Sequence, residues 1–260
     1  MNNMEAFVLG LVQGLTEFLP VSSSGHLEIG KFLFGNLEES LNYTVAVHGA
    51  TVLSIIVVFW KDIVALFQGL FAFQINKDTI YILKILLSAI PVGILGMLFK
   101  DDVEALFNGR IHFVGAMLIV TGILLFATTL VPVGKRKISW LDSLIIGIAQ
   151  AAAVLPGISR SGATIVTGLL LGNDRTETTR FSFLMVLLPV IGANFIEIYS
   201  GDFSSKNPVG TLPLVIGFIT AFISGLFACK WMLSIVRKGK LFYFAIYCVV
   251  VGLGALLFFH

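Results

Sequence analysis

Charged residues are scarce in this chain. Its 260 residues include 17 Lys and Arg and 15 Asp and Glu, only 12% in total, against 57% hydrophobic residues. The mean hydropathy is +0.97. This is too little charge to cover the surface of a soluble globule, so the composition predicts an integral membrane protein. A net charge of +2 excludes nucleic acid as a partner.

Cysteine is nearly absent as well. Cys229 and Cys248 both lie inside apolar runs, which is typical of small buried hydrophobic residues and argues against a disulfide, a thiolate metal site or a nucleophilic thiol. The first five residues lack the basic segment that opens a signal peptide, so we expect them to be retained.

Apolar runs fill most of the chain. Crossing a bilayer of ~30 Å takes ~20 residues in a helix, and six runs are long enough. They cover residues 42–60, 79–99, 113–131, 178–200, 211–235 and 241–259. Pro91 predicts a kink in the second run. Residues 63–73 are predicted to form an interfacial or short connecting helix, and Glu38-Glu39 a surface loop.

Two further apolar stretches, 5–18 and 139–155, are too short to cross. Each is followed by a polar turn and a short apolar return limb, over 25–34 and up to Gly172, which predicts two re-entrant hairpins. The predicted fold class is an all-α integral membrane protein with about six transmembrane helices and two re-entrant helical hairpins. Ser139 and Asp142 are interpreted as the helix-start pair of the second hairpin, with Asp142 a cap rather than a catalyst.

The first polar turn follows the helix that carries Gln13 and Glu17. These two residues are four apart and share one helix face, and Pro20 stops the helix. The turn contains three serines and a glycine before His26, a composition that can direct backbone N–H groups toward an anion. Polar groups are costly within a membrane unless they have a partner or a function, so this turn is a predicted site.

The second polar turn contains Arg160 in the stretch Pro-Gly-Ile-Ser-Arg-Ser-Gly-Ala-Thr, residues 156–164. An arginine at the start of a half-helix, among serine and glycine, combines a bidentate phosphate clamp with backbone donors. The predicted ligand is a phosphate or diphosphate. The alternative is an ion pair, with Glu17 as a partner, that braces the two halves of the chain.

The chain contains a weak internal repeat. A shift of 137 positions aligns Gly10 with Gly147, Gln13 with Gln150, Ser22 with Ser159, Ser24 with Ser161, Gly25 with Gly162 and Gly35 with Gly172. We therefore predict one membrane domain, 1–260, with repeat 1 at about 1–132 and repeat 2 at about 139–260. Because each half has three spans, the second half starts from the opposite side of the membrane, and the repeats are inverted. Inverted repeats of this kind bring both turns together near the midplane, so Arg160 should approach Glu17, Ser23 and His26.

Loop charge predicts the orientation. The side reached after the first span collects ten basic residues, and the other side has four: Lys31, Lys100, Arg110 and Lys206. The positive-inside rule makes the first side cytoplasmic and puts both termini and the opening of the first hairpin outside.

The residue types leave several chemical roles open. Ser23 is a candidate phosphoryl-accepting nucleophile with His26 as its base or as the leaving-group acid; alternatively, His26 or a water attacks. Glu17 holds a divalent cation or accepts a proton, with the Gln13 amide oxygen beside it. His48 is interpreted as a packed, hydrogen-bonded histidine in preference to a site residue.

Both turns resemble the signatures of a known family. Gln-x-x-x-Glu at 13–17, Pro-Val-Ser-Ser-Ser-Gly-His at 20–26 and the turn at 156–164 are similar to those of bacterial undecaprenyl-pyrophosphate phosphatases of the BacA type. The resemblance extends over the whole chain in length and span pattern. The first motif position is Glu or Gln in that family, and Gln13 supplies no second carboxylate.

The resemblance implies that the chain removes the terminal phosphate of a polyprenyl diphosphate carrier of cell-wall synthesis, in a bacterial inner membrane, with a link to bacitracin resistance. It implies dependence on a divalent cation, for which Mg²⁺ or Ca²⁺ and the ligand Glu17 are predicted. The loop charges predict that the site opens to the periplasmic or extracellular side, and a homodimer is a further expectation. The implied catalytic residues are Glu17, Ser23, His26 and Arg160; the implied substrate-binding residues are Gln13, Ser22, Ser24, Gly25, Ser159, Ser161 and Thr164. The alternative is a lipid flippase or secondary transporter on the same repeat.

Overall fold

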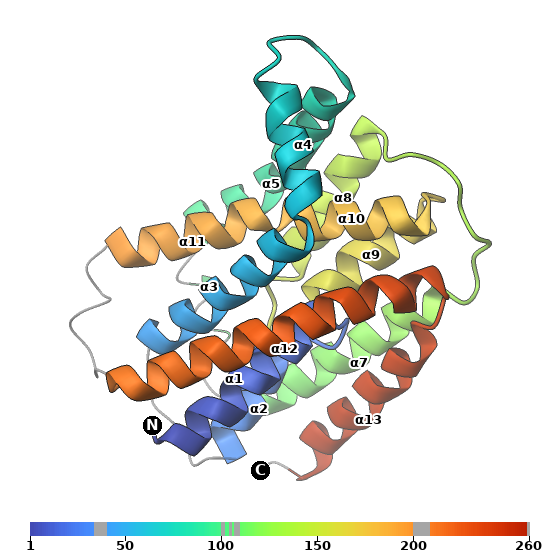
Figure 1. Ribbon diagram of the computed structural model, residues 1–260. Coiled ribbons are helices and arrows are strands. Elements are labelled where there is room, and N and C mark those ends of the chain that lie inside the picture. Colours follow the sequence, from blue (N-terminus) through green and yellow to red (C-terminus); the bar gives the residue numbers. More distant parts are fainter. Residues whose placement is uncertain (34–40, 100–101, 104–105, 107–109, 200–208, 259–260) are drawn as a thin grey trace.

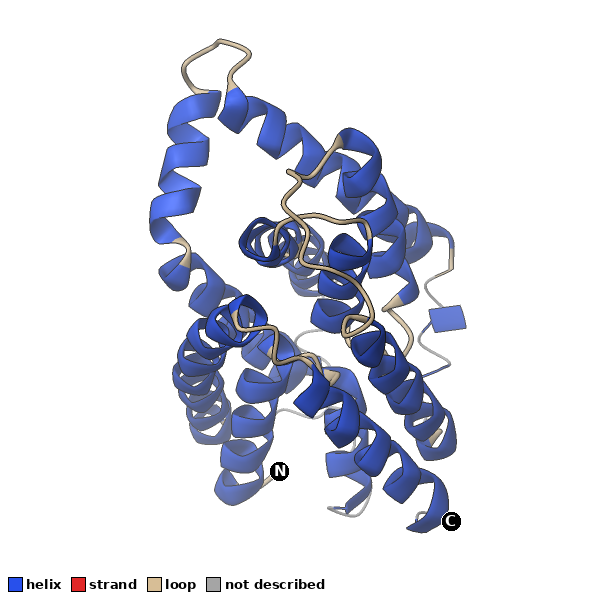
Figure 2. Cartoon of the chain, turned by 90° about the vertical axis from the view of Figure 1, so that its right-hand side faces the viewer, coloured by secondary structure: helices blue, strands red, loops and turns tan. Residues whose placement is uncertain are grey.

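A computed structural model describes residues 1–33, 41–99, 102–103, 106, 110–199 and 209–258. Over these residues the chain is helical, and its only extended pairing is two isolated bridges, Gly134 with Asp174 and Arg136 with Asn173 (Figures 1 and 2). The all-α prediction is confirmed for this part of the chain. The predicted surface loop at Glu38-Glu39 lies outside the described residues.

The first half forms helices where apolar runs predict them. Asn2 and Glu5 form a capping box that starts the first helix, and the chain turns before Pro20. Helix α5 continues through Pro91. The bounds are α1 Asn3–Phe18, α2 Ser23–Leu33, α3 Leu41–Val58, α4 Trp60–Leu70, α5 Lys77–Leu98 and α7 Ile111–Ala127.

The second half begins with the capping box of Ser139 and Asp142, which confirms Asp142 as a cap. The predicted run at 178–200 is two helices separated at Val186. The bounds are α8 Trp140–Ala152, α9 Arg160–Leu170, α10 Arg175–Met185, α11 Leu187–Tyr199, α12 Thr211–Arg237 and α13 Phe242–Phe258.

Helix length supports a membrane protein with several spans. Within the described residues, three segments are long and apolar enough to cross a bilayer, namely 77–98, 175–196 and 211–237. A fourth is obtained if α3 and α4, which meet at a 77° bend, count as one span. Helices α7 and α13 are apolar and 17 residues long. The coarse expectation is confirmed, and the count of six stays a prediction.

Polar and apolar side chains are distributed as a lipid environment requires. Large apolar side chains face outward, for example Phe227, which is 71% exposed, and Val250, which is 62% exposed. The interior, in contrast, holds buried polar residues such as Gln13, Ser54, Gln150 and Thr164. Lipid covers an outer face of this kind, while polar groups need internal partners. Cys229 and Cys248 are free and fully buried, as predicted.

Small residues set the closest helix contacts. Helix α1 packs along α12, with the Gly10 and Gly217 backbones in contact, and α8 packs on α5, with Gly147 against the Ser88 backbone. Helices α7 and α13 cross at Gly115 and Gly252, where a Cβ on either glycine would lie within 3.0 Å of the other's carbonyl oxygen. Such contacts replace the hydrophobic effect between helices in a bilayer.

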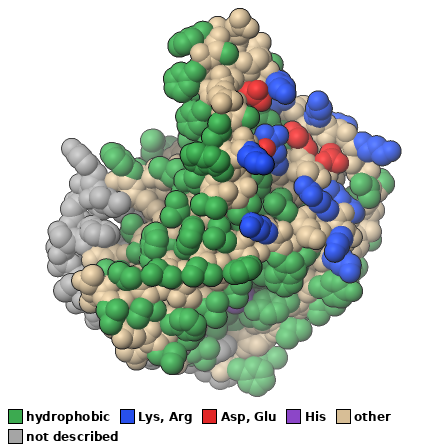
Figure 3. Space-filling view, viewed as in Figure 1, with side chains coloured by type: hydrophobic (Ala, Val, Ile, Leu, Met, Phe, Trp, Pro, Cys, Tyr) green, Lys and Arg blue, Asp and Glu red, His purple; other side chains and the backbone are tan. Residues whose placement is uncertain are grey.

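Basic residues gather at one end of the molecule (Figure 3). Polar contacts join the segments at this end: Arg180 of α10 forms an ion pair with Asp62 of α4 at 2.8 Å, and the Arg136 backbone N–H donates to Gly172 O at 3.3 Å. Arg175 donates to the carbonyl of Arg237 at 3.4 Å. The loops after α3, α7, α9 and α12 therefore lie on one side, as the charge pattern predicts.

Candidate active site

The first turn of the predicted site begins where α1 ends. Pro20 cannot continue the helix, and Leu19 is already extended at φ −71° and ψ 146°. Glu17 therefore lies in the last turn of α1, and its side chain is only 10% exposed.

Ser22 starts the return helix. Its hydroxyl accepts from the Gly25 N–H at 3.2 Å, which makes it the N-cap of α2 and places Ser23 at the first helical position. Ser22 has φ +68°, a left-handed conformation that L residues rarely adopt. Strain of this kind persists where the surrounding structure fixes it, which is common at functional sites.

The second turn repeats the cap of the first but not its left-handed backbone, since Ser159 has φ −72°. Ser159 caps α9, because its hydroxyl accepts from the Gly162 N–H at 3.0 Å, and Arg160 takes the first helical position. Helix α7 also contacts Ser159, whose backbone N–H donates to the Thr121 hydroxyl at 3.0 Å. Ser23 and Arg160 thus occupy matching positions, each at a helix N-terminus, where backbone N–H groups favour an anion.

The two turns meet at the Glu17 carboxylate. Oε2 accepts from the Ser23 hydroxyl at 2.7 Å and from Gln13 Nε2 at 3.1 Å. Oε1 accepts from Arg160 Nη2, so an ion pair joins the two turns across 143 residues of sequence. The predicted approach of Arg160 to Glu17 is confirmed. Arg160 Nη1 and Gln13 Oε1 are buried without a hydrogen-bond partner among the described residues.

His26 uses its ring differently. Nδ1 lies 2.8 Å from the Ser22 carbonyl, and Nε2 lies 2.8 Å from the Tyr247 hydroxyl of α13. The two rings also stack, with centroids 5.6 Å apart and an angle of 8°. The ring nitrogens of His26 are therefore directed to these two oxygens, and its chemical role stays a prediction. No sequence pattern indicated Tyr247, which lies in an otherwise apolar run.

The supporting hydroxyls hold the turns in shape. The hydroxyl oxygens of Ser22 and Ser24 lie 3.3 Å apart, and those of Ser159 and Ser161 also lie 3.3 Å apart, so the same pair forms in each repeat. Ser161 donates to the Leu19 carbonyl at 3.2 Å, and Thr164 lies 2.6 Å from Ser182. Substrate contact by these hydroxyls stays a prediction, while their part in building the turns is visible.

A cavity of about 430 Å³ opens beside Arg160. Its polar lining includes Arg160, Gln150 from α8, Asn194 from α11, and Thr44 and His48 from α3. His48 Nδ1 lies 2.9 Å from the Thr44 carbonyl, and His48 is within range of electrostatic interaction with Glu17. The interpretation of His48 as hydrogen-bonded holds, but it also lines the cavity. Sequence reasoning did not predict this cavity. The only sequence feature that points to it is the alignment of Gln150, one of its lining residues, with Gln13 in the repeat.

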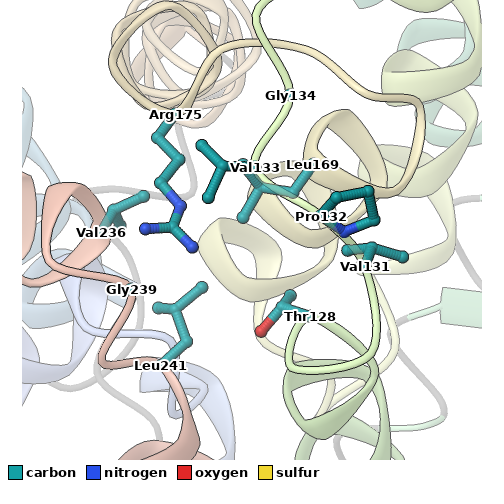
Figure 4. A pocket seen from close by; sticks show the side chains of 10 residues that line it. All are labelled: Thr128, Val131, Pro132, Val133, Gly134, Leu169, Arg175, Val236, Gly239 and Leu241. Atoms are coloured by element: carbon teal, nitrogen blue, oxygen red, sulfur yellow. The ribbon is translucent and has the colours of Figure 1, made fainter.

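A second pocket lies at the basic end, between the 128–134 segment and Arg175 (Figure 4). It measures about 20 Å³, room for about one water. Its lining comes from residues remote from Glu17, so it is separate from the predicted site.

A divalent cation that accompanies a diphosphate needs oxygen ligands, and the residues around Glu17 supply a few. Among the described residues no cluster of three His, Cys, Asp or Glu side chains could form a protein cage for a metal. The Glu17 carboxylate and the unpartnered Gln13 Oε1 are nevertheless hard oxygen ligands on residues that contact each other, through Gln13 Nε2 and Glu17 Oε2. Mg²⁺ is commonly held by one or two such ligands together with substrate phosphates and water, so the residues fit an ion that arrives with a diphosphate.

Comparison with known proteins agrees with this geometry. Residues 6–254 match the family described as "Bacitracin resistance protein BacA". A protein of Bacteroides fragilis named undecaprenyl-diphosphatase is 53% identical over 253 residues, 95% of each chain. Proteins of the same name from Bacteroides thetaiotaomicron and Halothermothrix orenii are 52% and 40% identical, covering 99% and 97% of this chain and 99% and 96% of their own. The chain belongs to the BacA family.

Proposed function

We propose that this protein is a membrane-embedded hydrolase that converts undecaprenyl diphosphate to undecaprenyl phosphate and inorganic phosphate, and so recycles the lipid carrier of cell-wall synthesis. The observation that carries the proposal is the meeting of Ser23, Glu17 and Arg160 at two facing helix N-termini. The names of the relatives support the substrate.

Ser23 is the proposed nucleophile. Its hydroxyl donates to Glu17 at 2.7 Å, the arrangement of a nucleophile and its general base. As Ser23 Oγ attacks the terminal phosphorus, its proton passes to Glu17, the bridging P–O bond breaks, and undecaprenyl phosphate leaves. Glu17 passes the proton it took from Ser23 to the departing lipid phosphate and is a carboxylate again. Water then attacks the phosphoserine and gives one proton to Glu17. The Ser23 Oγ–P bond breaks, Ser23 Oγ takes this proton from Glu17, and inorganic phosphate leaves with the second proton of the water.

Arg160 is the proposed clamp. Nη2 holds Glu17 in place, while Nη1 has no partner within the described structure and is available to a phosphate oxygen. The guanidinium stabilises the charge of the transferring phosphoryl group, which is the main contribution a protein makes to such reactions.

A divalent cation, Mg²⁺ or Ca²⁺, is proposed to bind with the diphosphate, next to Glu17 and Gln13. When bound it would neutralise phosphate charge and favour departure of the lipid phosphate. We expect a chelator to reduce turnover and added Mg²⁺ or Ca²⁺ to restore it.

The proposed architecture has six spans and an inverted repeat, in the bacterial inner membrane. Three pairs of features related by 137 positions support it: the Ser22 and Ser159 caps, the Ser–Ser contacts, and the reciprocal contact of Gly115 with Gly252. The basic end supports a cytoplasmic side there and a site open to the periplasmic or extracellular side.

Purified protein and a synthetic polyprenyl diphosphate test the proposal. We expect phosphate release by the wild type, and a loss of about 10²–10⁴-fold in Ser23→Ala and Glu17→Gln, the usual contribution of general-base catalysis or more. Label on the terminal phosphate should appear on Ser23 after an acid quench. Ser54→Ala is the control, because Ser54 is buried in α3 and donates only to carbonyls. A protein that moves the lipid without releasing phosphate would be a flippase or transporter instead.

A further inference from the structure

Gln150 is a buried amide that the fold leaves without a partner. It lies near the end of α8, is 2% exposed, and neither Nε2 nor Oε1 makes a hydrogen bond within the described structure. An unsatisfied buried polar group costs about 1–3 kcal/mol, and most such groups in proteins are paired. Gln150 therefore needs a partner that the chain itself does not supply.

The internal repeat shows which partner Gln150 lacks. Gln150 matches Gln13, whose Nε2 donates to Glu17 four residues later. The residue four positions after Gln150 is Val154. The amide thus has a carboxylate partner in the first repeat, while the corresponding position of the second repeat holds a valine.

Gln150 is one of the residues that line the cavity beside Arg160. Gln150 and Arg160 both line this space of about 430 Å³, and Arg160 Nη1 is likewise buried and unpartnered. Two residues that each carry an unpartnered donor, one neutral and one charged, therefore line one cavity. Its other walls include the apolar residues Val154, Val186 and Val190. Donors beside an apolar wall suit a ligand with an anionic head on a hydrocarbon chain.

We propose that Gln150 is a substrate-binding residue, whose Nε2 donates to an oxygen of the same diphosphate that Arg160 Nη1 holds. The proposal rests on the proposed function for the identity of the lipid, but it requires only a diphosphate in the cavity. Gln150 takes no part in the proton transfers between Ser23 and Glu17, so its loss acts on binding more than on the chemical step.

The test compares Gln150→Leu, which keeps the approximate side-chain size and removes the amide, with the wild type. We expect KM for the lipid diphosphate to rise about ten- to a hundredfold, the equivalent of one hydrogen bond to a charged group, with a smaller change in kcat. Inorganic diphosphate should raise the melting temperature of the wild type in detergent and raise that of Gln150→Leu much less at the same concentration.

Thr178→Val is the matched control. Thr178 is 1% exposed, its hydroxyl is also buried without a partner in the described structure, and it packs against Gly168 away from the cavity. This variant should keep the wild-type KM and the wild-type response to inorganic diphosphate. Gln150→Asn, which retracts the amide by one carbon, should raise KM as Gln150→Leu does and serves if the leucine variant does not fold.

An unchanged KM in a folded Gln150 variant, or a wild type that inorganic diphosphate does not stabilise, overturns the proposal. Failure of the proposed function gives a different result: the wild type then releases no phosphate from the lipid, while the melting measurements still report whether Gln150 binds diphosphate.

Discussion

At the scale of single residues, Arg160 carries two interactions that substitution can separate. Its side chain is 16% exposed and forms an ion pair with Glu17 through Nη2, while Nη1 has no hydrogen-bond partner within the described structure. Lysine keeps a positive charge for Glu17 but lacks the planar fork that holds two oxygen atoms at once.

We expect Arg160→Lys to fold and to lose turnover by about ten- to a hundredfold or more, since a charge-assisted hydrogen bond is worth ~1.5–3 kcal/mol. Arg160→Ala should also lower the melting temperature, because removing one partner of a buried pair costs about 3–5 kcal/mol. Turnover and melting in detergent check both. A lysine variant with normal turnover and reduced stability would make Arg160 a brace between the repeats.

His26 depends on a residue far away in the sequence. Tyr247 both stacks on its ring and contacts Nε2. Tyr247→Phe keeps the stacking and removes the hydroxyl, so it should lower kcat by a factor of about two to ten, the worth of one neutral hydrogen bond. The control is Tyr243→Phe on the same helix, whose side chain is 66% exposed. Equal kcat in both variants and the wild type would show that the Tyr247 contact does not orient His26 for catalysis.

At the scale of elements, α1 packs closely against α12 because Gly14 has no side chain at their contact. A Cβ on Gly14 would lie 2.0 Å from the Ser224 hydroxyl and 2.4 Å from the Ala221 carbonyl. Gly14→Ala should therefore push the helices apart and lower stability by about 1–3 kcal/mol, the usual cost of overpacking. Because Glu17 lies one turn further along α1, kcat should fall too.

Gly96→Ala in α5 is the matched control for Gly14→Ala. Nothing lies within 4 Å of a Cβ placed there, so the change should be neutral, or stabilising by up to ~1 kcal/mol through helix propensity. Melting in detergent measures both variants. A Gly14→Ala protein as stable as Gly96→Ala would mean that α1 is free to move on α12.

The elements also show how far the sequence alone could go. The stop at Pro20, the Ser139–Asp142 cap and the meeting of Arg160 with Glu17 were all predictable, because each depends on local chemistry or on the repeat. The 77° bend between α3 and α4 was not, since no proline or glycine marks it. The contact of Tyr247 with His26 was not predictable either, because it depends on the rotation of α13 against α2.

At the scale of the whole molecule, the two ends differ in charge, and the basic end is predicted to be cytoplasmic. Lys137 lies at that end and is exposed, and Arg110, also exposed, precedes α7 at the opposite end. The native cysteines are buried in the protein, so a single introduced cysteine can report its own location.

In intact cells, Arg110→Cys should react with a membrane-impermeant thiol reagent added outside, and Lys137→Cys should react only after the membrane is permeabilised. The reason is the excess of Lys and Arg in the loops around Lys137. If those loops were outside, all of these charges would have had to cross the bilayer. The wild type is the control for background labelling of Cys229 and Cys248. The reverse pattern would place the opening of the Glu17 site on the cytoplasmic side, and the lipid diphosphate would then have to be hydrolysed there.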